Sequence, residues 1–261
     1  MQYNESTRDL HFSKTFMRSF AEQHYMLRQF VDGMGLLLTS GTDEQRSHGW
    51  QTLKVAWSAY YREFGDGAEA LGHFTRASLA AGASVSSNGG TAPNCVHCAL
   101  GDYIGASDAR GGIPEALNHA LVGWIRKTAA GRNECVNTTL WPEVLRDLGF
   151  GHTDQPIVGD LVVYTILGGA ALTDEYAVHF GRVVAPSDPQ QQQQYGIMVE
   201  SKSGYAFDTY VHPLNVVDPT YLISSPCMRV HFFRPLREPL PGHRLSALAK
   251  QYAERLTRQS P

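Results

Sequence analysis

The sequence has few cysteines, no excess charge of either sign and no long hydrophobic run. Its 4 cysteines in 261 residues are too few for a disulfide-based scaffold. Lys and Arg number 22 and Asp and Glu number 25, and the net charge of −3 does not indicate nucleic acid or an anionic membrane as the partner. The longest notable uncharged run, residues 161–172, is too short to cross a bilayer. A hydrophobic fraction of 43% excludes a largely disordered chain.

Signals for secretion are also missing. The first twenty residues contain no continuous apolar block, so no secretory signal is visible. We therefore expect a cytoplasmic protein with reduced thiols, and leaderless export is the alternative. The length predicts one or two domains with a sizeable core, and we find no internal repeat. Nothing in the sequence indicates an oligomeric state.

The first third of the chain has the pattern of helices. Apolar side chains recur at helical spacing across residues 16–81, and Thr42 begins a Thr-Asp-Glu-Gln run that fits a capping box. We interpret residues 1–85 as a helical N-terminal region whose aromatic side chains form a core rather than a cofactor site. Residues 82–94 hold almost nothing apolar and predict a loop or a domain linker.

Further helices are expected in the middle and at the end of the chain. One begins at Cys95, a second covers residues 114–129, and a third runs from Pro142 to Leu148. A helical stripe near the end predicts a C-terminal helix within residues 237–261, packed on the domain or on a partner.

After Gly149 the period changes to that of strands. Five strand candidates follow, over residues 161–167, 177–185, 196–201, 205–211 and 228–233. The short connections between them predict an antiparallel sheet. A Pro- and Gln-rich stretch at 186–194 is expected to be a mobile hairpin tip. Helices that precede an antiparallel sheet argue for an α+β fold, with a catalytic or binding domain at 86–236.

The most distinctive local pattern is the segment 93–98, Pro-Asn-Cys-Val-His-Cys. Cys95 and Cys98 supply half of a structural zinc signature, and the isolated Cys135 and Cys227 do not supply the other half. The pair also fits a dithiol redox motif, although such a motif normally follows a strand and this one follows a polar loop. A third interpretation is a single nucleophilic cysteine. The structural alternative is a pair of small buried side chains.

A nucleophilic Cys95 has candidate partners in the expected strands. The N-terminus of a helix lowers the pKa of a thiol, and a cysteine nucleophile needs a base and a group that orients the base. His179 and Glu200 lie in successive strands, so an antiparallel hairpin would place them within reach of each other. We therefore expect His179 to deprotonate Cys95 and Glu200 to hold the imidazole. The backbone N–H of Cys95 is the expected oxyanion donor.

Four motifs occur in an order that resembles a known enzyme family. They are Asn-Cys-Val-His-Cys-Ala at 94–99, Val-Gly-Asp-Leu-Val-Val-Tyr at 158–164, Val-His-Phe-Gly-Arg-Val-Val at 178–184 and Ile-Met-Val-Glu-Ser at 197–201. In this order the chain resembles the NlpC-type papain-like cysteine peptidases and, more loosely, the CHAP amidases. The Asn-Cys-x-His stretch is also similar to lecithin:retinol acyltransferase-like proteins. Those proteins carry their histidine before their cysteine, so the unpermuted order fits better.

The resemblance implies a papain-like antiparallel sheet packed on the helix that carries the nucleophile. It makes Cys95 the nucleophile, His179 the base and Glu200 the third polar residue, with Gly159-Asp160 as a structural turn, and it implies no metal and no organic cofactor. The chain has Asn-Cys-Val-His where family members usually carry Asp-Cys-Ser-Gly, and Glu200 where His, Asn or Gln is common. These departures indicate a divergent member with a different substrate.

The expected function is hydrolysis of an amide or peptide bond through a thioester, with cell-wall peptide as a candidate substrate. Acyl transfer, transglutamination or deamidation would use the same acyl-enzyme and is the first alternative. A non-catalytic binding module on a degenerate protease fold is the second, and a role as a secreted effector also stays open. Cys98 is the alternative nucleophile, and His212 is an expected residue of the cleft wall.

Overall fold

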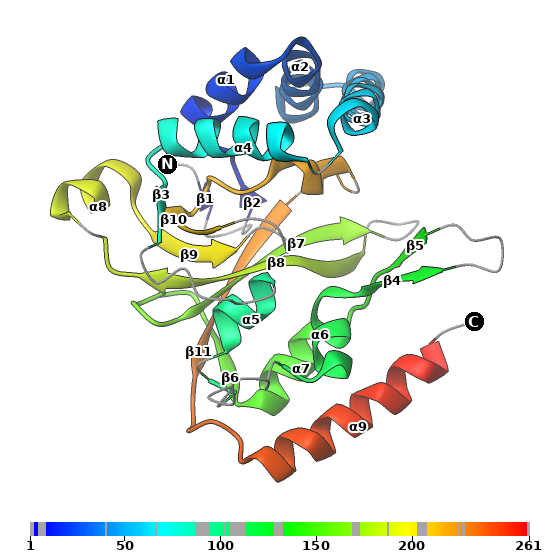
Figure 1. Ribbon diagram of the computed structural model, residues 1–261, viewed down its shortest axis with the longest axis vertical. Helices are drawn as coiled ribbons and strands as arrows, with labels where there is room; N and C mark the ends of the chain where they lie inside the picture. The colour runs from blue at the N-terminus through cyan, green and yellow to red at the C-terminus, as the bar shows by residue number, and fades with distance from the viewer. Residues whose placement is uncertain are drawn as a thin grey trace.

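The computed structural model describes residues 3–4, 9–39, 41–65, 67–86, 94–101, 103–104, 113–127, 133–168, 173–186, 188–202, 208–223, 225 and 228–259. It has an α+β architecture in which one large sheet lies between two layers of helices (Figure 1). Antiparallel strands, as the pattern after Gly149 predicts, make up the centre of this sheet, but the connection between its strands β8 (Asp174–Val184) and β9 (Met198–Lys202) is longer than expected.

The large sheet joins nine strands in the order β1-β2-β11-β7-β8-β9-β10-β3, with β6 paired to β11. Their bounds are β1 Tyr3–Asn4, β2 Asp9–Leu10, β3 Ser84–Val85, β6 Phe150–Thr153, β7 Leu161–Gly168, β8 Asp174–Val184, β9 Met198–Lys202, β10 Thr209–Pro213 and β11 Met228–Pro235. A separate two-stranded sheet contains β4 (Trp124–Lys127) and β5 (Asn133–Val136).

Four N-terminal helices cover one face of the sheet: α1 (Lys14–Gln23), α2 (Tyr25–Thr39), α3 (Asp43–Phe64) and α4 (Ala68–Ala80). Their buried side chains form a single core with residues of β7, β9 and β11, so the burial of apolar surface holds the helices on the sheet. Thr42 is the N-cap of α3 as expected, and its side chain accepts a hydrogen bond from the backbone of Gln45, one of the two bonds of a capping box.

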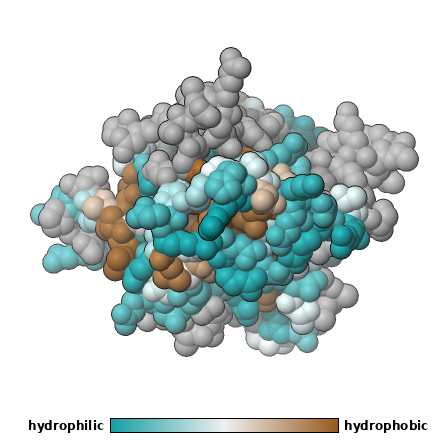
Figure 2. Space-filling model, turned by 90° about the horizontal axis from the view of Figure 1, so that it is seen from below, coloured by the Kyte–Doolittle hydropathy of each residue, from teal (hydrophilic) through white to brown (hydrophobic). Residues whose placement is uncertain are grey.

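The other face of the sheet carries α5 (Cys95–Leu100), α6 (Glu115–Val122), α7 (Trp141–Leu148) and α9 (Gly242–Gln259). The C-terminal helix packs on the domain itself, because its apolar stripe is buried in the core that α6 and α7 share with the sheet. The surface on the side of α9 is largely hydrophilic, and its hydrophobic residues gather to one side (Figure 2).

The structure corrects two expectations about local structure. The helix expected over 114–129 ends at Val122, because Gly123 has φ = 74° and turns the chain into β4. The Gln-rich stretch, expected as a hairpin tip, includes a short helix, α8 (Pro189–Tyr195).

Residues before 86 also contribute three short strands, β1, β2 and β3, to the large sheet, so the N-terminal region is not helical throughout. None of the described helices is long and apolar enough to cross a membrane.

Candidate functional site

A β-bulge decides which way His179 points. Across β7 and β8, Tyr164 pairs with His179 but Thr165 pairs with Ala177, so Val178 is an extra residue in β8. A bulge puts two successive side chains on one face and re-aims those that follow. Ala177 packs in the core on the α5 side, whereas His179 lines a cavity on the α4 side. Without the extra residue the two side chains would share a face.

Ser201 and His212 reach the same face from the next two strands and bind His179 in a chain. The Ser201 Oγ lies 2.9 Å from Nε2 of His179 and 2.8 Å from Nε2 of His212. The Nδ1 of His212 lies 2.9 Å from the carbonyl oxygen of Pro213. We call the three side chains of His179, Ser201 and His212 the histidine relay.

The hydrogen bonds of the relay fix where its protons are. A carbonyl oxygen only accepts, so Nδ1 of His212 donates to Pro213, and in a neutral ring Nε2 must then accept. The Ser201 hydroxyl therefore donates to His212, and its oxygen accepts from Nε2–H of His179. A neutral His179 consequently has its unprotonated nitrogen at Nδ1, on the side away from Ser201.

Both rings of the relay are neutral near pH 7. Burial, together with nearby His212, lowers the pKa of His179 to about 3, and burial lowers the pKa of His212 to about 4. The rings of Tyr164 and Tyr221 pack on the imidazole of His179, with centroid distances of 5.5 and 5.8 Å. These apolar surroundings explain why a cation at His179 is costly in the resting protein.

Glycine at 181 makes room for this arrangement. Gly181 pairs with Ser201 across β8 and β9, and a Cβ at Gly181 would clash with the side chains of Val199 and Ser201. The glycine of the His-Phe-Gly motif therefore allows the two strands to bring Ser201 next to His179.

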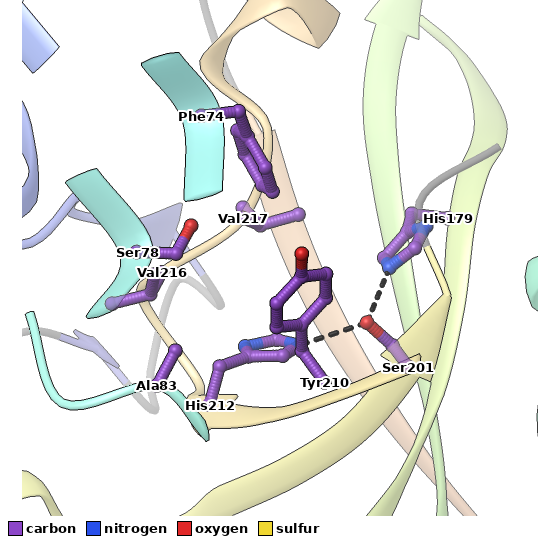
Figure 3. A pocket seen from close by; sticks show the side chains of 9 residues that line it. All are labelled: Phe74, Ser78, Ala83, His179, Ser201, Tyr210, His212, Val216 and Val217. Atoms are coloured by element: carbon purple, nitrogen blue, oxygen red, sulfur yellow. Dashed lines mark hydrogen bonds between the residues drawn. The ribbon is translucent and has the colours of Figure 1, made fainter. Parts of the chain in front are cut away.

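A narrow cavity of about 10 Å³, room for about one water molecule, lies between α4 and the relay (Figure 3). Nine residues line it: Phe74, Ser78, Ala83, His179, Ser201, Tyr210, His212, Val216 and Val217. No charged side chain is among them. The Ser78 hydroxyl is buried there and has no hydrogen-bond partner among the residues that the structure describes. The cavity thus borders the back of the relay, opposite to Nδ1 of His179.

Cys95 opens α5 as expected, and Asn94 caps this helix. The Asn94 Oδ1 accepts hydrogen bonds from the backbone N–H of His97 at 3.0 Å and from its Nδ1 at 2.8 Å. The Asn94 amide in turn donates to Asn118 of α6. His97 is therefore part of the cap that holds Cys95 in place. The Asn and the His of the Asn-Cys-Val-His motif thus have a structural role.

The thiol of Cys95 lies against the strand that carries His179. Burial raises its pKa to about 11, and the backbone N–H of Phe180, the residue after His179, opposes this rise by a hydrogen bond to the sulfur. The expectation of a lowered thiol pKa is wrong, because burial outweighs the amides at the helix N-terminus. The thiol is also close enough to Tyr221 that its negative form would raise the pKa of that phenol.

The Cys95 thiol bonds to the backbone next to His179, and its hydrogen bonds do not include the His179 imidazole. Among the described residues, the partners of the His179 ring are Ser201 at Nε2 and the hydroxyl of Tyr221, 3.4 Å from Nδ1. Tyr221 is thus adjacent to both Cys95 and His179.

Glu200 does not orient His179, which corrects the expected third residue. Its carboxylate accepts from the Ser86 hydroxyl at 2.6 Å and lies 3.3 Å from Arg182. Neighbouring residues of a strand face opposite sides, so Glu200 points toward α5 where Ser201 points toward α4. Burial is the main cause of the raised pKa of the Cys98 thiol, and the carboxylate of Glu200 raises it further.

A second polar cluster lies on the α5 side of the sheet, away from Cys95. Glu175 Oε1 is 2.5 Å from His231 Nε2 and accepts from Thr165 Oγ1 at 2.5 Å. Burial opposes the charge of Glu175, but the bonds from His231 and Thr165 hold its pKa below the usual value. The indole of Trp141 packs on the His231 ring and donates to the backbone of Glu175.

Asp160 has the structural role expected of it. Its carboxylate accepts from the backbone of Ile157 at 2.8 Å and from two nitrogens of Arg234 at 3.0 and 2.8 Å. Gly159, with φ = 96°, completes the turn before β7.

Metal ligation was the other chemistry open to the cysteines. No group of three or more His, Cys, Asp or Glu side chains could hold a metal ion within the described part of the chain. Cys95 and Cys98 are free thiols. The side chains of Cys135 and Cys227 lie outside the described residues.

The sequence reasoning missed Ser201 and Tyr221. Alternation along β9 could have offered Ser201 as the neighbour of Glu200 on the opposite face, but it does not say which face His179 takes. Tyr221 lies in a short 3₁₀ helix, η1 (Pro219–Ile223), and no pattern in the sequence connects it with Cys95.

Comparisons of the chain with protein-family models, with curated proteins and with solved structures find no match.

Proposed function

We propose that the protein is a cysteine-dependent hydrolase of an amide or peptide bond, with Cys95 as nucleophile and His179 as base, on a papain-like arrangement of helix and sheet. The observation that carries this proposal is the hydrogen bond to the Cys95 sulfur from the backbone N–H of Phe180, the residue that follows His179. The relay fixes the basic nitrogen of that histidine at Nδ1.

In this mechanism the thiol proton moves as the substrate is attacked. Nδ1 of His179 takes the proton of Cys95 while the sulfur bonds to the carbonyl carbon, and the leaving amine then takes that proton. The thioester is cleaved by water, whose proton passes through Nδ1, and the carboxylic acid leaves as the C–S bond breaks. The raised thiol pKa and lowered imidazole pKa favour this general-base route over a preformed ion pair.

Ser201 replaces Glu200 as the orienting group in this proposal. It holds the ring of His179 through Nε2 and is itself fixed by His212. Cys98 is a weaker candidate for the nucleophile, because burial and the nearby carboxylate of Glu200 both disfavour its thiolate.

An activated ester tests the proposal without knowledge of the natural substrate. On p-nitrophenyl acetate we expect release of nitrophenolate and an acetyl group on Cys95, located by peptide mass spectrometry and removed by hydroxylamine. Cys95→Ser should abolish it, and His179→Ala should slow it by about 10²-fold, as for loss of a general base. The matched control Cys98→Ser keeps the wild-type rate.

Acetylation of Cys95 at the same rate in wild type and His179→Ala would reject the dyad. Once Cys95 is shown to be acylated, cell-wall peptides and glutamine peptides are the substrates to try first. An added amine that appears in the product would assign acyl transfer rather than hydrolysis.

A further inference from the structure

Tyr221 packs on the proposed base and is close enough to the proposed nucleophile for a Cys95 thiolate to raise the pKa of its phenol. Its ring stacks on the imidazole of His179 with an interplanar angle of 29°, and its hydroxyl lies 3.4 Å from Nδ1. Asp218 holds the start of η1, because its Oδ1 accepts from the backbone of Thr220 at 2.9 Å. Tyr221 is therefore placed on His179 by a short, capped turn between β10 and β11.

The proton positions in the relay give the Tyr221 hydroxyl one role. Nδ1 of a neutral His179 carries the lone pair, so the phenol donates its hydrogen bond to it. Burial, together with Asp218 and Cys95, raises the pKa of Tyr221 well above its ordinary value, so the phenol keeps its proton. A lone pair that already accepts this bond is not free to accept the proton of Cys95.

We propose that Tyr221 is a latch on the base: its hydroxyl occupies Nδ1 of His179 in the substrate-free protein and turns away before that nitrogen takes the proton of Cys95. This inference rests on the proposed function. At 3.4 Å the bond is long, so it is one that a substrate group can replace. The η1 turn packs on α3, so the N-terminal helices help to hold the latch in place.

The latch implies that removing one hydroxyl makes Cys95 more reactive. Iodoacetamide is a suitable probe because alkylation forms an S–C bond, breaks the C–I bond and releases iodide, with the thiol proton going to Nδ1. No oxyanion forms, so a role of Tyr221 as an oxyanion donor would not affect this rate. In Tyr221→Phe we expect alkylation of Cys95 near neutral pH to be about fivefold faster, the effect of losing one ordinary hydrogen bond.

A double variant and a control make the result specific. In Tyr221→Phe/His179→Ala the gain should vanish, because it acts through the imidazole. In Tyr221→Phe the acid limb of the pH profile of alkylation should also move to higher pH, because the neutral imidazole loses a hydrogen bond and its pKa rises, which a merely structural role would not produce. The control is Tyr210→Phe, whose hydroxyl bonds to Thr75 instead of His179 and whose removal should leave the rate unchanged.

An unchanged or slower alkylation in Tyr221→Phe would overturn the latch. The proposed function fails separately, if acetylation of Cys95 by the ester does not depend on His179. Acetylation that needs His179, together with alkylation unaffected by Tyr221→Phe, would retain the dyad and reject only the latch.

Discussion

Two buried histidine clusters lie on opposite faces of one sheet and differ in whether a carboxylate is present. On the α5 side, His231 is bonded to Glu175, which can stabilise a positive ring. On the α4 side, His179 is bonded to a hydroxyl and, through it, to a second neutral ring. No carboxylate of the described residues bonds to His179, so in the proposed mechanism the Cys95 thiolate is the anion that matches a positive ring. The difference separates a cluster suited to structure from one suited to transient proton transfer.

The largest expected effect concerns the response of stability to acid. The folded pKa values of His179 and His212, about 3 and about 4, lie below the ordinary 6.5. Between these folded values and pH 6.5 the unfolded chain therefore binds more protons than the folded protein. Their contribution to stability is complete above pH 6.5 and is lost as the pH falls toward 4, by about 1.4 kcal/mol per pH unit for each histidine.

Urea unfolding at several pH values would measure this slope. His212→Gln should remove about half of the contribution of these two histidines, because His179 remains buried and neutral. His243→Gln is the control, since this histidine of α9 is exposed. Equal slopes in wild type and His212→Gln would contradict the assignment.

The next effect concerns the carboxylate-paired cluster. Glu175→Ala leaves His231 and Thr165 without their common partner, and we expect a loss of about 1–2 kcal/mol in the free energy of unfolding at neutral pH. The value is at the lower end of the range for buried groups, because the Glu175 side chain is 25% exposed and water can replace part of the interaction. Acetylation of Cys95 should stay at the wild-type rate. A loss below about 0.5 kcal/mol would mean that water replaces the carboxylate fully.

A smaller effect distinguishes the two neighbours on β9. Ser201→Ala removes the bond that fixes the His179 ring, and we expect acetylation of Cys95 to slow by about tenfold. Glu200→Gln, on the opposite face, should leave the rate within about twofold. The reverse order of effects would restore Glu200 as the orienting residue.

The smallest effect is expected at Ser78. Its buried hydroxyl has no partner among the described residues, so Ser78→Ala removes a group that is costly to bury and should leave the stability unchanged or raise it by about 0.5 kcal/mol. Thermal unfolding would measure this. A clear loss of stability would show that the hydroxyl is satisfied by bound water in the cavity.

The sequence predicted the order of the helices and strands better than it predicted which strands pair with one another. Apolar periodicity found α3, α4 and α7 and the central strands β7, β8, β9 and β11, because these elements bury one regular face. It missed the end of α6 at Gly123, where one residue with positive φ outweighs the helical pattern of its neighbours. It also could not find β1 and β2, which are too short to show a period.

The candidate site was predicted only in part, because local motifs identify residues but do not say on which face of the sheet a side chain lies. Cys95 and His179 were named from their local motifs, and the structure places the Cys95 sulfur on the backbone N–H of Phe180, the residue after His179. Glu200 was chosen for its chemistry, but the face of a strand residue depends on register and on bulges. The extra residue Val178 cannot be recognised from the sequence, and the long connection between β8 and β9 hides their register.

The shared core on the α4 side has a consequence for how this protein could have evolved. Side chains of α1–α4 pack against Val162, Tyr164 and Val199 of the sheet, so each part supplies the apolar partner of the other. A gene rearrangement that transferred residues 86–236 alone would expose this apolar face and one wall of the cavity behind His179. We therefore expect the N-terminal helices and the sheet to be inherited together, and to diverge as one unit.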